Sequence, residues 1–169
     1  MTWPIRRWIK HRWSEPADVR RALGKAALAR IEQRVRESER HHSGEIRVCV
    51  EAGLPWSYLW RGASARERAI ALFGKLRLWD TQANNGVLIY LLYAEHAIEI
   101  VADRGLNDKV EPGQWVHLVE DMRSAFRAGQ FEQGLLAAID EVDRVLVDRY
   151  PVTPGQANTN ELPDQPDLR

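Results

Sequence analysis

The fold is decided by residues 80–92, DTQANNGVLIYLL, in which a short polar loop runs directly into an apolar segment. Residues 87–92 carry β-branched and aromatic side chains with no charged residue among them, a pattern typical of a strand buried on both faces. The loop before them supplies one carboxylate, two asparagine side chains and Gly86, which tolerates a positive φ. We therefore expect a central strand that is entered from an oxygen-rich loop.

The composition favours one soluble domain with terminal segments. The chain has 169 residues, of which 44% are hydrophobic and 28% charged, as is ordinary for a globular protein. Its 24 basic and 24 acidic residues balance, so net charge gives no argument for a nucleic-acid partner. Cys49 is the single cysteine, which excludes an internal disulfide and a cysteine-based metal cluster. The sequence shows no signal-peptide core and no run of about 20 apolar residues, so we expect a cytoplasmic protein without a transmembrane segment.

Two further strands are expected beside the central one. Residues 45–51 alternate apolar and polar side chains, and residues 97–103 follow the central strand after a short turn. The first two strands are joined through a helical pattern and should be parallel, whereas the second and third form an antiparallel hairpin. An α/β domain is therefore expected over residues 17–150. Residues 1–16 form a basic, tryptophan-rich segment, and the composition of residues 151–169 predicts a disordered tail.

Chain direction should bring separated polar residues to one edge of this sheet. Glu45 starts the first strand, Asn85 precedes the second, and Asp103 ends the third, which runs backwards. Asp80 and Asn84 belong to the loop above that edge. Oxygen ligands without sulfur suit Ca²⁺ or Mg²⁺, so these five residues form a candidate metal site.

Turn chemistry is the alternative explanation for the same residues. Asp80 could cap a turn, the Asn-Asn-Gly sequence could serve the turn itself, and Asp103 could pair with Arg104 or Arg77. The edge also lies at the start of the parallel strands, whereas ligands of α/β proteins usually bind at their carboxyl ends. The spacing alone leaves both explanations open.

Other catalytic motifs are not supported by the sequence. It contains no phosphate-binding glycine loop and no Gly-x-Ser-x-Gly elbow, and we expect no serine to lie beside a histidine base. His41 and His42 fall in the last turn of the first long helix, where the helix dipole favours a cation. Adjacent helical positions do not share a face, which favours a capping role for them over a metal site.

The N-terminal segment places Trp3, Trp8 and Trp13 among basic residues. A basic segment with tryptophans can lie on a membrane surface. The alternative is a short helix whose tryptophans cover part of the domain.

Four motifs, taken together, resemble the TPM domain. They are SGEIRV at residues 43–48, NNGVLI at 84–89, VADRGL at 101–106 and FRAGQFEQG at 126–134. That family includes a thylakoid lumen protein linked to photosystem II repair and many bacterial proteins of unknown role. The resemblance covers about residues 17–150.

The resemblance implies a three-layer α/β/α sandwich with a small mixed sheet and helices on both faces, Rossmann-like in outline without a dinucleotide site. Family members are reported to bind Ca²⁺, and the plant member has been assigned acid phosphatase activity. The metal-associated loop of the family corresponds to Asp80, Asn84 and Asn85, while Asp103 and Glu45 are added from the strand geometry. This chain has Asn84-Asn85 where members often have an Asp-Asn pair, which should weaken cation binding. We also expect it to lack the signal sequence and anchor that are common in exported members.

Two functions follow from this resemblance. The first is an accessory or interaction module that holds Ca²⁺ at the loop edge and contacts a protein partner of unknown identity. The second is a weak metal-dependent acid phosphatase that hydrolyses phosphomonoesters, with the cation activating water. Such a phosphatase needs cationic groups at the same edge, and only Arg104 and Arg77 are candidates, while no nucleophile is evident. The residue types therefore favour the binding module.

Overall fold

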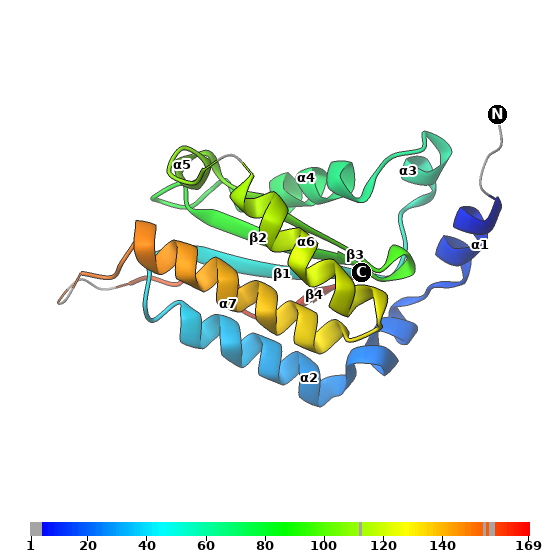
Figure 1. The fold of residues 1–169 in the computed structure, drawn as a ribbon, viewed down its shortest axis with the longest axis horizontal. Coiled ribbons are helices and arrows are strands. Elements are labelled where there is room, and N and C mark those ends of the chain that lie inside the picture. The colour runs from blue at the N-terminus through cyan, green and yellow to red at the C-terminus, as the bar shows by residue number, and fades with distance from the viewer. Residues whose placement is uncertain (1–4, 112, 154, 156–157) are drawn as a thin grey trace.

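The computed structural model describes residues 5–111, 113–153, 155 and 158–169. In this part of the chain the centre is a mixed four-stranded sheet in the order β3-β2-β1-β4 (Figure 1). The strands are β1 (Glu45–Glu51), β2 (Gly86–Leu92), β3 (Ala97–Ala102) and β4 (Asp167–Leu168). Strand β1 is parallel to both β2 and β4, and β3 is antiparallel to β2. The two expected strand pairings are therefore confirmed.

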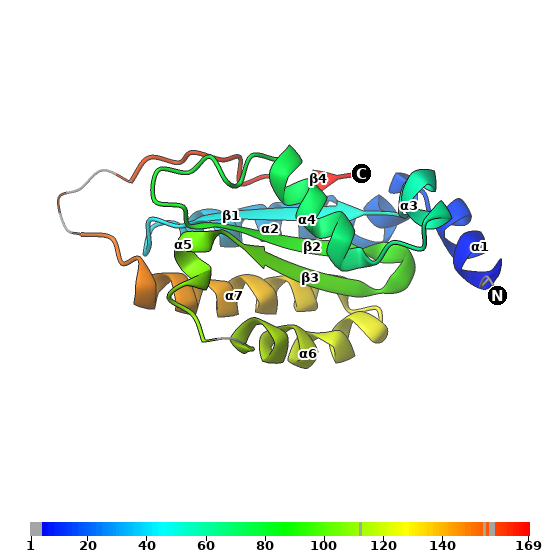
Figure 2. The same ribbon diagram turned by 90° about the horizontal axis from the view of Figure 1, so that it is seen from above.

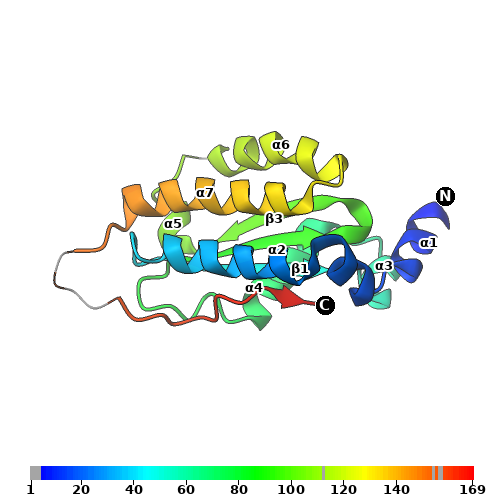
Figure 3. The same cartoon turned by 90° about the horizontal axis from the view of Figure 1, so that it is seen from below.

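Helices cover both faces of the sheet. The helices of the described residues are α1 (Ile5–Trp13), α2 (Pro16–Ser38), α3 (Trp56–Trp60), α4 (Ala65–Lys75), α5 (Arg104–Asn107), α6 (Gln114–Arg127) and α7 (Phe131–Arg149). A 3₁₀ turn, η1 (Tyr93–Glu95), lies between β2 and β3. Helices α2, α6 and α7 lie on one face and α4 on the other (Figures 2 and 3). The α/β fold with helices on both faces of a small mixed sheet is confirmed.

Strand β2 is the centre of the packing. All seven of its residues are buried. Val87, Ile89 and Leu91 pack into the core shared with α2 and α7, and the alternate residues pack into the core shared with α4. Burying one such aliphatic side chain stabilises a fold by roughly 1.5–3 kcal/mol, so a strand apolar on both faces holds the two layers together.

A capping box opens α4. The Ser64 hydroxyl accepts a hydrogen bond from the Glu67 backbone N–H at 3.2 Å, and the Glu67 carboxylate accepts one from the Ser64 N–H at 2.8 Å. Two backbone donors that the helix leaves unpaired are thereby satisfied. This local pattern fixes where α4 begins and hence which helical face meets β2.

The C-terminal segment differs from the disordered tail expected for residues 151–169. Its described residues 158–169 run along the open edge of β1 and end in β4, where Cys49 pairs with Asp167. The Ala52 N–H donates to the Arg169 carbonyl at 2.8 Å, and the Arg47 guanidinium donates to the Gln165 carbonyl at 2.7 Å. Composition alone missed this segment because unpaired backbone groups on an edge strand stabilise even a polar chain that pairs with them.

Candidate functional site

The starts of β1 and β2 and the end of β3 meet at one edge of the sheet. Glu45 is paired with Gly86 in the parallel β1–β2 ladder. The Asp103 backbone N–H donates to the Gly86 carbonyl oxygen at 2.9 Å, directly beyond the last β2–β3 pair. Chain direction therefore brings Glu45, Asn85 and Asp103 to a common edge, as the strand order predicted.

The loop that leads into β2 is held tightly against its neighbours. Arg77 and Asn84 adopt positive φ angles of 60° and 50°, a conformation uncommon outside glycine. A Cβ atom at Gly86 would collide with the Leu78 carbonyl oxygen, and one at Gly105 would lie 2.6 Å from the Asn84 carbonyl oxygen. Glycine at these two positions allows the loop to pack against the start of β2 and against α5.

Two buried side-chain oxygens at this edge accept no hydrogen bond from the described residues. The Asn85 side chain is buried and donates from Nδ2 to the Ser43 carbonyl at 3.0 Å, which leaves its Oδ1 atom without a donor. Asp103 accepts from the Arg104 backbone N–H through Oδ1 at 2.6 Å, and its buried Oδ2 has no donor. A buried acceptor without a partner costs about 1–3 kcal/mol, so a pair of them at one edge calls for an explanation.

Asp103 thus caps helix α5 through a backbone hydrogen bond. The alternative pairing of Asp103 with the Arg104 side chain is replaced by this contact with the Arg104 main chain. Helix α5 itself was missed in the sequence because its four residues carry no periodic pattern.

Glu45 was expected to be a metal ligand, but its carboxylate binds the C-terminal segment. Its two carboxylate oxygens accept the backbone N–H groups of Glu161 and Leu162, each at 3.1 Å. Burial raises the pKa of Glu45, while these two bonds act in the opposite direction. The side chain holds the C-terminal segment in place, a role that no local signal in the sequence could have indicated.

Asp80 and Asn84 lie on the exposed part of the loop. Both are open to solvent, whereas Thr81 and Asn85 are buried. The Thr81 hydroxyl accepts from the Asn85 backbone N–H at 3.2 Å, which ties the loop to the start of β2. The five predicted site residues therefore divide into a buried pair, Glu45 bound to the C-terminal segment, and two solvent-facing loop residues.

The family model of the TPM domain matches residues 17–145 of this chain. The chain belongs to the TPM domain family. The match covers β1, β2, β3 and the candidate edge, so the fold around these residues is that of the TPM domain. No curated protein matches the chain.

Two solved structures resemble this TPM domain. The NMR structure of the BA42 protein from the psychrophilic bacterium Bizionia argentinensis is 28% identical, with a TM-score of 0.72 over 84% of this chain and 92% of that one. The solution NMR structure of the N-terminal domain of a protein from P. gingivalis is 20% identical, with a TM-score of 0.60 over 78% of this chain and 82% of that one. The second likeness concerns the fold alone.

Among the residues that the structure describes, no group of three or more histidine, cysteine, aspartate or glutamate side chains could hold a metal ion. A cation at the edge would therefore depend on Asn85, on main-chain or solvent oxygens, and on few carboxylates. A polar cavity of about 270 Å³ lies beside the edge, between Ser43, Gln82 and Ala83 on one side and the C-terminal segment on the other.

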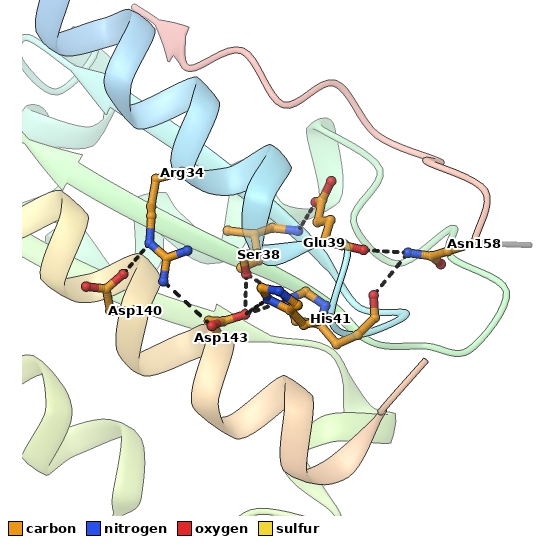
Figure 4. Close-up of polar contacts among 9 residues, drawn as sticks. Arg34, Ser38, Glu39, His41, Asp140, Asp143 and Asn158 are labelled. Atoms are coloured by element: carbon orange, nitrogen blue, oxygen red, sulfur yellow. Dashed lines mark hydrogen bonds and ion pairs between the residues drawn. The ribbon is translucent and has the colours of Figure 1, made fainter. Parts of the chain in front are cut away.

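A second polar cluster joins α2 to α7 (Figure 4). The Ser38 hydroxyl lies 2.8 Å from His42 Nε2 and donates to Asp143 Oδ1 at 2.7 Å. A serine therefore does lie beside a histidine, which was not foreseen from the sequence. The spacing of four residues between Ser38 and His42 was the signal that could have found the pair.

The geometry of this cluster is that of a packing contact. Ser38 and Asp143 both approach the same nitrogen of His42, whereas a catalytic aspartate orients the histidine through its other nitrogen. Ser38 and His42 are fully buried, and burial lowers the pKa of His42 to about 4. A neutral buried His42 does not supply the cationic helix cap that the sequence suggested, and only His41 is exposed to solvent.

Proposed function

We propose that this TPM domain is an accessory module that binds a divalent cation, Ca²⁺ before Mg²⁺, at the edge formed by residues 80–85 and Asp103. One observation carries the proposal. Asn85 Oδ1 and Asp103 Oδ2 are buried oxygens to which no described residue donates a hydrogen bond, at a place where two strand ends are joined by a backbone hydrogen bond. A hard cation would satisfy both atoms, and its positive charge would offset the cost of burying the Asp103 carboxylate.

The chemistry of these groups favours Ca²⁺ and a weak site. Calcium takes six to eight oxygen ligands in flexible geometry, and carboxylate, amide and main-chain oxygens all qualify. The exposed side chains of Asp80 and Asn84 lie on the same loop and can complete the set together with solvent. Because few carboxylates are present, the dissociation constant should be on the order of 10⁻⁴–10⁻³ M, as for extracellular calcium modules. Glu45 is left out of the set because both of its oxygens already accept backbone N–H groups.

Calorimetric titration of the full chain with Ca²⁺ tests this proposal. The wild type should bind, and Asp103→Asn should bind at least roughly tenfold more weakly, because one carboxylate ligand becomes a neutral amide. Asp80→Asn should weaken binding as well. The control is Asp108→Asn, an exposed aspartate at the end of α5, which should leave the isotherm unchanged. A flat wild-type titration at millimolar Ca²⁺ would refute the proposal and would mean that the edge residues serve only to form the turn.

The phosphatase alternative is separated by a second assay on the same proteins. Arg104 is exposed directly after Asp103 and could meet a phosphoryl group there. Metal-dependent release of phosphate from a phosphomonoester, abolished by both Asp80→Ala and Asp103→Ala, would favour the enzyme. Cation binding without turnover is the result that the accessory module predicts.

A further inference from the structure

Helix α1 is fixed to the domain by one of its faces. His11 is buried, its Nδ1 accepts from the Leu54 backbone N–H at 2.9 Å, and its Nε2 lies 2.8 Å from Glu95 Oε1. Arg7 donates to the same Glu95 oxygen at 2.7 Å. These contacts hold the helix at the end of the molecule where the β2–β3 turn lies (Figures 1 and 2). The face that α1 presents to solvent is therefore set by the fold.

That solvent face is apolar along its centre and basic along both borders. Ile5, Ile9 and Trp13 are spaced four residues apart and form one stripe, with exposed fractions of 71%, 48% and 78%. At about 100° per residue, Arg12 falls on one side of this stripe and Arg6 and Lys10 on the other. All three of these basic residues are exposed, and the sequence of α1, IRRWIKHRW, contains no acidic residue.

A second exposed aromatic surface lies next to α1. Trp56 and Trp60 of α3 are 60% and 64% exposed, and their rings lie 4.4 Å and 6.3 Å from the ring of Trp8. Helix α3 lies beside α1 at the same end of the molecule (Figures 1 and 2). Tryptophan is enriched at membrane–water interfaces because its ring is amphipathic.

We propose that this basic-aromatic end, formed by Ile5, Arg6, Ile9, Lys10, Arg12 and Trp13 with α3 beside it, docks on a bilayer surface that contains anionic phospholipid. Charge complementarity selects this occupant. Each exposed cation near a negatively charged leaflet contributes attraction, while the apolar stripe can enter the headgroup region with α1 lying in the plane of the surface.

The structure changes which residues take part. Of the tryptophans suggested by the sequence, Trp3 lies outside the described residues and Trp8 is packed against α3. Trp13 remains, and Ile5 and Ile9 replace the other two. None of the described helices is long and apolar enough to cross a membrane.

Vesicle flotation of the full chain tests this proposal. Vesicles of phosphatidylglycerol and phosphatidylcholine in equal parts are compared with vesicles of phosphatidylcholine alone. The wild type should float with the anionic vesicles only, and added salt should release it, since the attraction is screened. The double variant Ile9→Gln with Trp13→Gln should lose roughly tenfold or more of the binding, because both apolar anchors are removed.

The matched control exchanges the same residue types elsewhere on the surface. Ile70 and Trp79 are 53% and 54% exposed and lie outside α1 and α3. Ile70→Gln with Trp79→Gln should bind anionic vesicles within about twofold of the wild type. Thermal melting of all three chains establishes that each is folded.

Three results would overturn the proposal. One is equal binding by the α1 variant and the control. Another is a wild type that fails to float with anionic vesicles at low salt. The third is a dimer of the wild type that Ile9→Gln with Trp13→Gln converts to a monomer in light scattering, which would make a second copy of the chain the occupant of this surface.

Discussion

Glu39 is a buried carboxyl group whose protonation is coupled to folding. It accepts a hydrogen bond from the Ile46 backbone N–H at 3.0 Å, and burial raises its pKa to about 8. Its ordinary pKa is 4.5, so the proton is bound more tightly in the folded chain than in the unfolded one. The stability that Glu39 contributes is therefore fully present below its unfolded pKa and is lost as the pH rises toward the folded value.

The variant Glu39→Gln should remove this dependence on pH. Its amide oxygen can still accept from Ile46, but it does not ionise. The unfolding free energy of the variant minus that of the wild type should increase by a few kcal/mol between about pH 4.5 and about pH 8 and level off above. Chemical unfolding at several pH values measures it.

His42 also makes the stability depend on pH, in the opposite direction from Glu39. Burial lowers its pKa to about 4, so its contribution is present above its ordinary pKa of 6.5 and is lost on acidification. His42 is unchanged in both chains, so its effect cancels in the difference. A difference between variant and wild type that stays constant with pH would contradict the raised pKa of Glu39.

Helix α4 is fastened to the sheet by a buried ion pair. Arg68 contacts both oxygens of Glu51, at 2.6 Å and 2.9 Å, and the Tyr90 hydroxyl donates to the same carboxylate at 2.7 Å. The side chains of Arg68 and Glu51 are only 12% and 4% exposed. Together with Tyr90, the pair links α4 to the neighbouring strands β1 and β2.

Glu51→Gln should lower the unfolding free energy by about 3–5 kcal/mol, because it leaves the buried Arg68 without a counter-charge. Urea unfolding followed by circular dichroism measures the loss. Glu120→Gln removes one partner of the exposed pair with Arg123 and should have almost no effect. Equal losses in the two variants would mean that the burial of the Glu51–Arg68 pair carries no special weight.

The elements that could be predicted from the sequence are those with a characteristic local sequence pattern. The apolar run of β2 and the capping box at Ser64 and Glu67 belong to this class. Helix α3 and strand β4 do not, since they have five and two residues and are held by contacts with distant parts of the chain. At the edge, chain direction sufficed to bring Asn85 and Asp103 together. The two hydrogen bonds that Glu45 accepts depend on the path of residues 158–169, which no local sequence pattern determines.

At the scale of the whole molecule, the C-terminal segment closes one side of the sheet. Deleting residues 158–169 should remove the hydrogen bond from the Ala52 N–H and leave the buried Glu45 carboxylate without its two donors. We expect faster hydrogen exchange at the Ala52 amide and a fall of a few kcal/mol in the unfolding free energy. The β3 amide groups that bond to β2 serve as the reference. Unchanged exchange at Ala52 would show that the segment does not pair with β1 in solution.

The two proposed surfaces lie at opposite ends of the long axis. Helix α5, beside the candidate cation edge, is at one end, and helix α1 is at the other (Figure 1). A chain docked through α1 on a bilayer would therefore hold the loop edge away from the membrane surface. Asp103→Asn should leave vesicle flotation unchanged, and Ile9→Gln with Trp13→Gln should leave the calcium isotherm unchanged.

The proposed cation site requires that Asn85 and Asp103 give oxygen ligands to one ion. A crystal structure of the full chain grown with saturating Ca²⁺ tests this most directly. We expect a cation about 2.3–2.6 Å from both Asn85 Oδ1 and Asp103 Oδ2. A protein donor or an ordered water at each of these atoms, with no cation between them, would contradict it.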